Sequence, residues 1–256
     1  MTQRISLPRL KNALPALCAL LLCACAAQND LGAGDPIDSL QGRQAMTERR
    51  LATAAADAIA QGRTEEALAN YERLYARNKS DTGIVLNYAQ LLRKSGRNEQ
   101  ALKILKPLAA NSRGSDFGKT PASLIRNEYA AALISAGQYG EAVTVLDKVL
   151  ANPKAQDFYP DANHLEGIAL DAQGQHKDAE PYFRRALETW HGDASAVMNN
   201  LALNLASQGN FDEALTLLRR AQVMDPAKTE IAKNIDIVAG LRAAVVPKPP
   251  VSVKKK

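Results

Sequence analysis

Small and large apolar residues recur along the chain at fixed distances from a set of glycines. These glycines are separated by 34, 41, 37 and 35 residues: Gly62, Gly96, Gly137, Gly174 and Gly209. Each is followed five positions later by an alanine and nine positions later by a large apolar residue: Ala67 and Tyr71, Ala101 and Leu105, Ala142 and Leu146, Ala179 and Phe183, Ala214 and Leu218. The segments between the glycines are rich in Ala, Leu, Glu, Lys and Gln, without alternation of apolar and polar residues. The pattern predicts an all-α chain of paired helices.

A second small residue stands seven positions before each glycine: Ala55, Ala89, Ala130, Gly167 and Ala202. Small residues let two antiparallel helices approach closely, and a glycine ends the first helix in the left-handed conformation that other residues resist. One such pair cannot bury its own apolar stripe, so the units are expected to stack.

These marks resemble the tetratricopeptide repeat, whose period is 34 residues. The last unit is the fullest match, with Leu201, Ala202, Leu205, Ala214, Leu218, Ala221 and Pro226 in register. The resemblance implies a right-handed superhelical solenoid of about five helix-turn-helix repeats in a domain of residues 46–246. The repeats span about residues 48–81, 82–115, 123–156, 160–193 and 195–228. Residues 229–246 carry Ile231, Ile235, Val238 and Leu241 at helical spacing, which predicts a capping helix over the last unit.

Three places depart from the repeat pattern. The first unit has Ala54 and Ala58 where larger residues are usual, which predicts a shallow capping end. The fourth unit has Glu166 at a normally apolar position: either its carboxylate reaches the rim, which we favour, or a polar partner holds it inside. Residues 111–123 are turn-rich and are expected to form a surface loop.

The first residues read as a secretion leader. Basic Arg4, Arg9 and Lys11 precede an apolar run of about residues 13–24, which is too short to span a bilayer. The run ends on Leu22-Cys23-Ala24-Cys25, which resembles the cleavage box of bacterial lipoproteins. That resemblance implies a signal peptide of residues 1–24, a lipidated Cys25 and a tether of residues 25–45. The alternative is an ordinary cleaved leader with a chance cysteine.

Charge and cysteine content narrow the class of partner. The chain has a net charge of +5, but the leader and the tail carry the excess, and residues 25–246 sum to −2. The body therefore offers no basic footprint for nucleic acid. The tail of residues 247–256 is proline-rich and basic, so it is expected to be extended and solvated, with contact to an anionic surface as the alternative. All three cysteines lie in or at the end of the leader, which excludes disulfides and cysteine metal sites from the mature chain.

No motif predicts catalysis, a cofactor or a metal site. The segment Gly114 to Thr120 resembles a phosphate loop, but it has three residues between its glycines instead of four and follows a predicted helix. His164, His176 and His191 occupy three different places in the repeat frame and form no ligand pattern. We expect a protein that is not an enzyme and whose one covalent group is the lipid on Cys25.

The repeat does predict a binding surface. In the family that the chain resembles, the first helix of each unit lines the concave face, and this register gives a candidate groove: Leu86, Gln90, Arg93, Asn127, Ile134, His164, Ile168, Asp171, Asn199 and Leu203. Aliphatic and amide side chains alternate along it, which suits an extended or helical peptide. The alternative for each residue is packing against a neighbouring helix, and we expect about half of them to be exposed.

Over nearly its whole length the chain resembles bacterial tetratricopeptide lipoproteins, and most closely the lipoprotein of tight-adherence (Flp) pilus loci. Phrases such as Leu165 to Gly174 and Met198 to Gly209 carry the closer resemblance, together with the leader and five units. It implies a scaffold or pilotin, lipid-anchored in the outer membrane and facing the periplasm, that helps a secretin or other pilus components assemble. Ala26 after the cysteine fits that sorting. A type IV pilus pilotin, a cofactor of outer-membrane or cell-wall assembly, and a periplasmic enzyme remain as alternatives.

Overall fold

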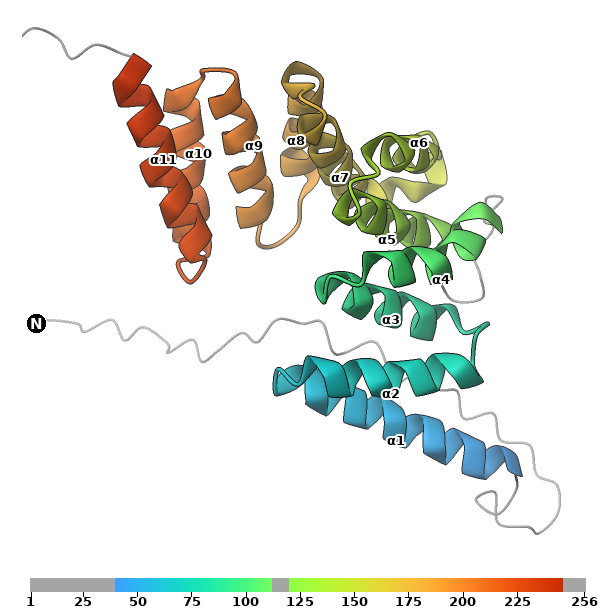
Figure 1. Cartoon of the computed structure of the whole chain (residues 1–256). Helices are drawn as coiled ribbons and strands as arrows, with labels where there is room; N and C mark the ends of the chain where they lie inside the picture. The colour runs from blue at the N-terminus through green and yellow to red at the C-terminus, as the bar shows by residue number, and fades with distance from the viewer. Residues whose placement is uncertain (1–39, 112–119, 246–256) are drawn as a thin grey trace, which may run out of the picture. The chain divides into compact units, whose positions relative to one another are not determined.

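A computed structural model describes residues 40–111 and 120–245, whose regular structure is helical (Figure 1). The α-helices are α1 (Leu40–Ala60), α2 (Thr64–Arg77), α3 (Thr82–Lys94), α4 (Asn98–Asn111), α5 (Ala122–Ser135), α6 (Tyr139–Leu150), α7 (Tyr159–Ala172), α8 (His176–Thr189), α9 (Ser195–Ser207), α10 (Phe211–Met224) and α11 (Thr229–Val245). A short 3₁₀ helix, Pro153–Phe158, joins α6 to α7. The predicted all-α class is confirmed.

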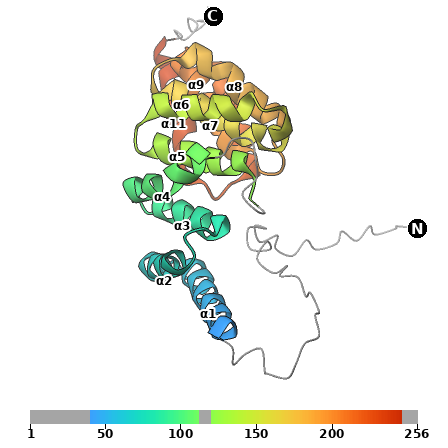
Figure 2. The same cartoon turned by 90° about the vertical axis from the view of Figure 1, so that its right-hand side faces the viewer.

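Each helix from α2 onward packs against the next one along the chain (Figures 1 and 2). The odd-numbered helices, which are the first helices of the repeats, also contact one another in the order α3, α5, α7, α9 and α11. Among the described residues no such contact joins one second helix to the next. The first helices therefore form a continuous row, which we name the first-helix face.

The five repeat glycines end the first helices as predicted. All have positive φ, from 69° at Gly62 to 85° at Gly209. At Gly96 the turn closes with two backbone hydrogen bonds, from Gly96 N–H to Arg93 O and from Arg97 N–H to Leu92 O. A side chain at this φ would be strained, so glycine is the residue that lets the second helix fold back.

The alanines that follow these glycines are fully buried: Ala67, Ala101, Ala142, Ala179 and Ala214. Around them the apolar side chains form two clusters. The first runs from α2 to α7 and includes Leu92, Leu133 and Leu146. The second runs from α8 to α11 and includes Phe183, Leu201 and Leu218. The two clusters meet inside the fourth repeat.

The prediction that Glu166 reaches the rim is wrong. Its side chain is only 1% exposed, and its Oε2 has no hydrogen-bond partner within residues 40–111 and 120–245. Burial, with the nearby Asp147 carboxylate, raises the pKa of Glu166 to about 7, while Arg185 acts in the opposite direction. The physical reason is the next residue: a Cβ on Gly167 would lie 2.7 Å from the ring of Phe183. Because α7 packs so closely on α8 there, the adjacent glutamate is enclosed.

The predicted capping helix forms, but it is only half covered. Ile231 and Val238 are buried against the last repeat, whereas Leu241, predicted to pack inside, is 48% exposed. Ile237 and Val245 are also exposed, so α11 presents an apolar stripe to solvent. No described helix is long and apolar enough to cross a bilayer.

Several predictions fall on residues that the structure does not describe. They are the leader of residues 1–24, the lipidation site Cys25, most of the tether, residues 112–119 of the predicted loop, and the tail of residues 247–256.

Candidate peptide-binding groove

Seven of the ten predicted groove residues are at least partly exposed: Gln90, Arg93, Ile134, His164, Ile168, Asp171 and Leu203. The other three, Leu86, Asn127 and Asn199, are buried. Asn127 Nδ2 donates to Phe158 O at 3.1 Å, and Asn199 Oδ1 accepts from Asn234 Nδ2 at 2.8 Å. These amides hold the 3₁₀ helix and α11 against the first helices, so the prediction that they lie open in a groove needs correction.

The exposed residues fall into two groups. In the second and third repeats, the Arg93 guanidinium is paired with Glu128 by two hydrogen bonds, of 2.7 Å and 3.2 Å. Gln90 and Ile134 line neither cavity described below. In the fourth and fifth repeats, by contrast, the predicted residues Ile168, Asp171 and Leu203 line one pocket.

This pocket has a volume of about 170 Å³ and lies where α7, α8 and α9 meet. Its lining residues are Ile168, Asp171 and Ala172 from α7, Phe183 from α8, and Asn200 and Leu203 from α9. Ile168, Asp171 and Leu203 were predicted, while Ala172, Phe183 and Asn200 were not. Phe183 belongs to the apolar series that follows the repeat glycines, and that series gave no sign that its ring reaches the first-helix face. Asn200 was missed by one position, because its neighbour Asn199 turns inward.

Aliphatic walls and a polar rim make up the pocket. Asp171 Oδ1 accepts from Asn204 Nδ2 at 2.6 Å and lies 2.7 Å from His176 Nδ1. Both contacts are on Oδ1, and none of the described residues bonds to Oδ2. A carboxylate held in this way keeps one oxygen for a donor on a ligand.

His164 supports the pocket from behind. Its Nε2 lies 2.9 Å from Asn200 Nδ2, and its ring packs against Phe183 and edge-on against Trp190, with centroids 6.1 Å and 5.6 Å apart. Burial lowers the pKa of His164 to about 4, so its ring is neutral at pH 7. The unprotonated Nε2 can then accept a hydrogen bond from Asn200 Nδ2. The aromatic contacts and this hydrogen bond fix the orientation of Asn200 at the rim.

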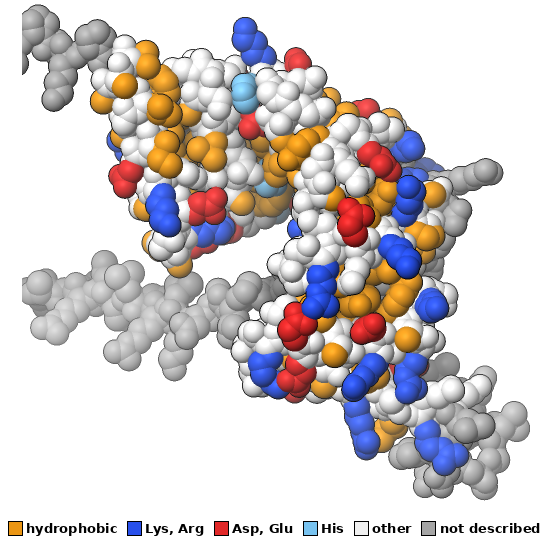
Figure 3. Space-filling view, in the orientation of Figure 1, with side chains coloured by type: hydrophobic (Ala, Val, Ile, Leu, Met, Phe, Trp, Pro, Cys, Tyr) orange, Lys and Arg blue, Asp and Glu red, His pale blue; other side chains and the backbone are white. Residues whose placement is uncertain are grey.

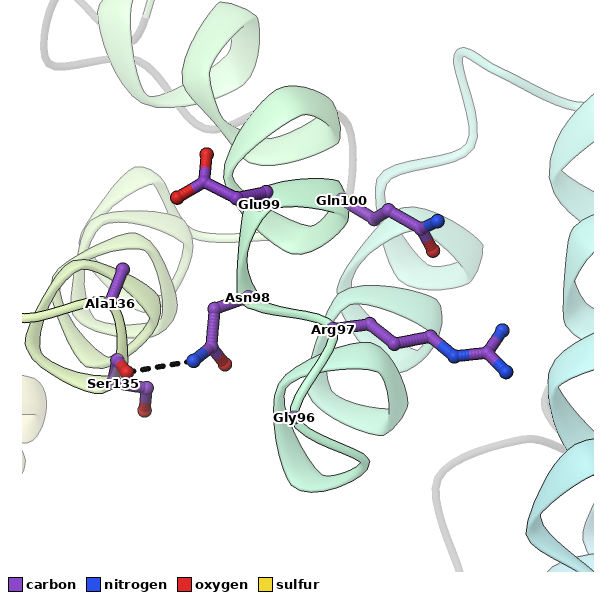
Figure 4. A pocket seen from close by; sticks show the side chains of 7 residues that line it. All are labelled: Gly96, Arg97, Asn98, Glu99, Gln100, Ser135 and Ala136. Carbon is purple, nitrogen blue, oxygen red and sulfur yellow. Dashed lines mark hydrogen bonds between the residues drawn. The ribbon is translucent and has the colours of Figure 1, made fainter.

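A second cavity, of about 490 Å³, lies between the turns of the second and third repeats and is lined by Gly96, Arg97, Asn98, Glu99, Gln100, Ser135 and Ala136 (Figure 4). Asn98 Nδ2 donates to Ser135 O at 2.7 Å across it. The side chains of Arg97 and Gln100 point away from Ser135 (Figure 4). It is an open joint between turns whose largest lining side chains are polar or charged, and no predicted groove residue lines it. Nowhere in residues 40–111 and 120–245 do three potential metal-binding side chains gather.

Models of the tetratricopeptide repeat match residues 58–117 and 160–224. The chain is a tetratricopeptide-repeat protein. No curated protein sequence matches it. Proteins with such repeats are scaffolds for protein–protein interaction and are typically not enzymes.

Solved structures agree on the fold. A thermophilic tetratricopeptide-repeat protein of Thermus thermophilus is 20% identical, with a TM-score of 0.60 over 75% of this chain and 98% of that one. A repeat protein of Parabacteroides merdae is 14% identical, with a TM-score of 0.52 over 77% and 73%. MamA of Desulfovibrio magneticus RS-1 is 16% identical, with a TM-score of 0.52 over 71% and 97%.

Proposed function

We propose that this tetratricopeptide-repeat protein binds a peptide segment of a partner protein at the pocket between α7, α8 and α9. The observation that carries the proposal is the combination of a small apolar cavity with one carboxylate oxygen at its rim to which no described residue donates a hydrogen bond. About 170 Å³ holds a single aliphatic side chain and is well below the several hundred Å³ of a typical small-molecule site. The carboxylate would accept a donor from the residue beside that side chain.

We further propose that the partner is a secretin or another component of a tight-adherence pilus and that the protein is a scaffold or pilotin held in the outer membrane by a lipid on Cys25. The leader motif Leu22 to Cys25 and the resemblance of the repeat phrases to pilus-locus lipoproteins support this assignment. An interaction scaffold on a lipid anchor would hold its partner next to the membrane, where a secretin must insert.

A charge placed in the pocket tests the peptide site. Ile168→Glu and Leu203→Glu put a carboxylate where an apolar anchor would bind, so capture of pilus components from detergent-solubilised membranes should fall about tenfold or more. Gln90→Glu is the matched control, because Gln90 and Ile168 both stand six positions before their repeat glycine. Circular dichroism checks that all three variants fold. Full capture by folded pocket variants, or equal loss in the control, would overturn the assignment.

Cys25→Ala tests the anchor. Without the Cys25 thiol the acyl chains that anchor a lipoprotein cannot be attached. The protein should therefore move to the soluble periplasmic fraction or stay unprocessed. Cys23→Ala is the control and should leave fractionation unchanged. A processed Cys25→Ala protein that still sediments with outer membranes would contradict the proposal.

A further inference from the structure

The pocket belongs to a row of aliphatic residues that leads to the end of α11. Ile168, Leu203 and Ile237 are spaced by 35 and 34 residues, so they occupy the same repeat position in α7, α9 and α11. Ile168 and Leu203 line the pocket, and Ile237 is 58% exposed. In Figure 3, hydrophobic side chains gather over α11 as well as near the junction of α9 with α7. This half of the first-helix face is therefore apolar beyond the pocket itself.

The same half of the chain is acidic. Residues 120–245 carry sixteen Asp and Glu against eleven Lys and Arg, whereas residues 45–111 carry seven Asp and Glu against eleven Lys and Arg. At the pocket Asp171 Oδ2, to which no described residue donates, adds a local acceptor. A ligand with apolar side chains next to positive charges fits this surface in both respects.

Residues 246–256 have that composition. Val251 and Val253 are two positions apart, so they project to the same side of an extended chain, and Lys254, Lys255 and Lys256 follow directly. Pro247, Pro249 and Pro250 disfavour a helix and favour an extended chain that rises about 3.1 Å per residue.

The geometry allows the segment to reach the pocket. The first helices run in the same direction, so α11 ends on the edge where α7 and α9 end (Figure 1). The pocket residue Asp171 is the next-to-last residue of α7, and Leu203 lies in the last turns of α9. Packed helices lie about 10 Å apart, which puts α7 about 20 Å from α11. Eight residues separate Val245 from Val253, and at the extended rise they span about 25 Å.

We propose that residues 246–256 of this chain dock on the first-helix face, with a tail valine in the pocket and the terminal lysines beside Asp171, and so compete with the partner. This docking rests on the proposed peptide site, for which the tail would compete with the partner. Partner binding then requires displacement of the tail, and a partner segment rich in Lys and Val would be favoured.

Site-specific crosslinking in the full chain tests this docking. A p-benzoylphenylalanine placed at position 253 should crosslink, on irradiation of dilute protein, to peptides of α7 and α9, as mapped by mass spectrometry. Replacing all three terminal lysines with glutamate should abolish that crosslink without touching the folded helices, and 1 M salt should weaken it, because the screening length falls to about 3 Å. Asp171→Asn should weaken it too, and Asp178→Asn on the exposed side of α8 is the matched control.

Four outcomes overturn the inference: no crosslink, a crosslink confined to other helices, a crosslink between two copies, or a crosslink that survives the lysine-to-glutamate change. Capture of the partner separates this inference from the proposed function. If the lysine-to-glutamate tail fails to raise capture several-fold while Ile168→Glu still abolishes it, the pocket is the partner site and the tail is not its competitor. If the tail crosslinks to the pocket but Ile168→Glu leaves capture intact, the docking stands and the proposed partner site is wrong.

Discussion

The two halves of the array share a frame but differ in the surface that they present. In both, a buried alanine follows the repeat glycine, as Ala101 does in the second repeat and Ala179 in the fourth. The position six residues before the glycine differs: it is Gln90 and Ala131 in the second and third repeats but Ile168 and Leu203 in the fourth and fifth. The second pair lines the pocket between α7, α8 and α9, whereas neither Gln90 nor Ala131 lines it. The frame specifies the fold, and a few positions on the first-helix face specify where a ligand binds.

A large side chain in place of a buried repeat alanine should cause the largest loss of unfolding free energy, and the loss should be equal in the two halves. Ala142 and Ala179 are fully buried at equivalent positions in the third and fourth repeats. Ala142→Leu and Ala179→Leu should each cost about 3 kcal/mol of unfolding free energy, because a close helix contact cannot accept the added volume. Denaturant titration measures this cost, with Lys177→Leu on the exposed surface as the control. A large loss in one half alone would mean that the frames differ.

The joint between the two core clusters should respond to a single methyl group. In Gly167→Ala the new Cβ would lie 2.7 Å from the buried ring of Phe183, so the variant should lose about 2 kcal/mol. Gly140→Ala in α6 and Gly240→Ala in α11 are matched controls, since a Cβ there meets nothing within 4 Å and alanine favours a helix. Thermal melts should separate Gly167 from both. An unchanged melt for Gly167→Ala would show that the joint is not tightly packed.

Glu166 should give the smallest of the three effects, and that effect should depend on pH. Because burial raises its folded pKa to about 7, from an ordinary value of 4.5, the folded state binds this proton more tightly than the unfolded state does. The cost of the buried charge is therefore full above pH 7 and disappears as the pH falls toward 4.5. Glu166→Gln should be more stable than the wild type by about 1 kcal/mol at pH 8, with the gap closing near pH 5.

His164 acts with the opposite sign and has to be separated from this effect. Burial lowers its pKa to about 4, from an ordinary value of 6.5, so the folded state resists protonation and stability falls as the pH drops from 6.5 toward 4. The Glu166 contribution is consequently read as the difference between the wild type and Glu166→Gln across the pH range. A constant difference from pH 8 to pH 5 would contradict a titrating Glu166.

The sequence predicted the features that depend on contacts within one repeat. Helix pairs, the left-handed glycines and the buried alanines follow from residue type and spacing, and the structure contains all three. In the groove, the resemblance to the repeat family, applied in this register, predicts Ile168, Asp171 and Leu203.

Features that depend on contacts between neighbouring elements were missed. Adjacent residues in a helix point about 100° apart, and this rotation puts Asn200 at the pocket and turns Asn199 toward Asn234 in α11. Glu166 is enclosed because its neighbour Gly167 brings α7 onto α8, and no pattern within α7 reveals how close a second helix will lie. Leu241 has the helical spacing of a core residue, but it is exposed because no described helix packs on its side of α11.

Trp190 gives the pocket an optical property. It is the only tryptophan of the chain, and its ring contacts His164, the residue that holds Asn200 at the pocket rim. Any ligand that shifts Asn200 or His164 alters the surroundings of that single indole. The intrinsic fluorescence of the unlabelled protein therefore reports on one place in the array, and occupancy of the pocket can be followed in real time by emission alone.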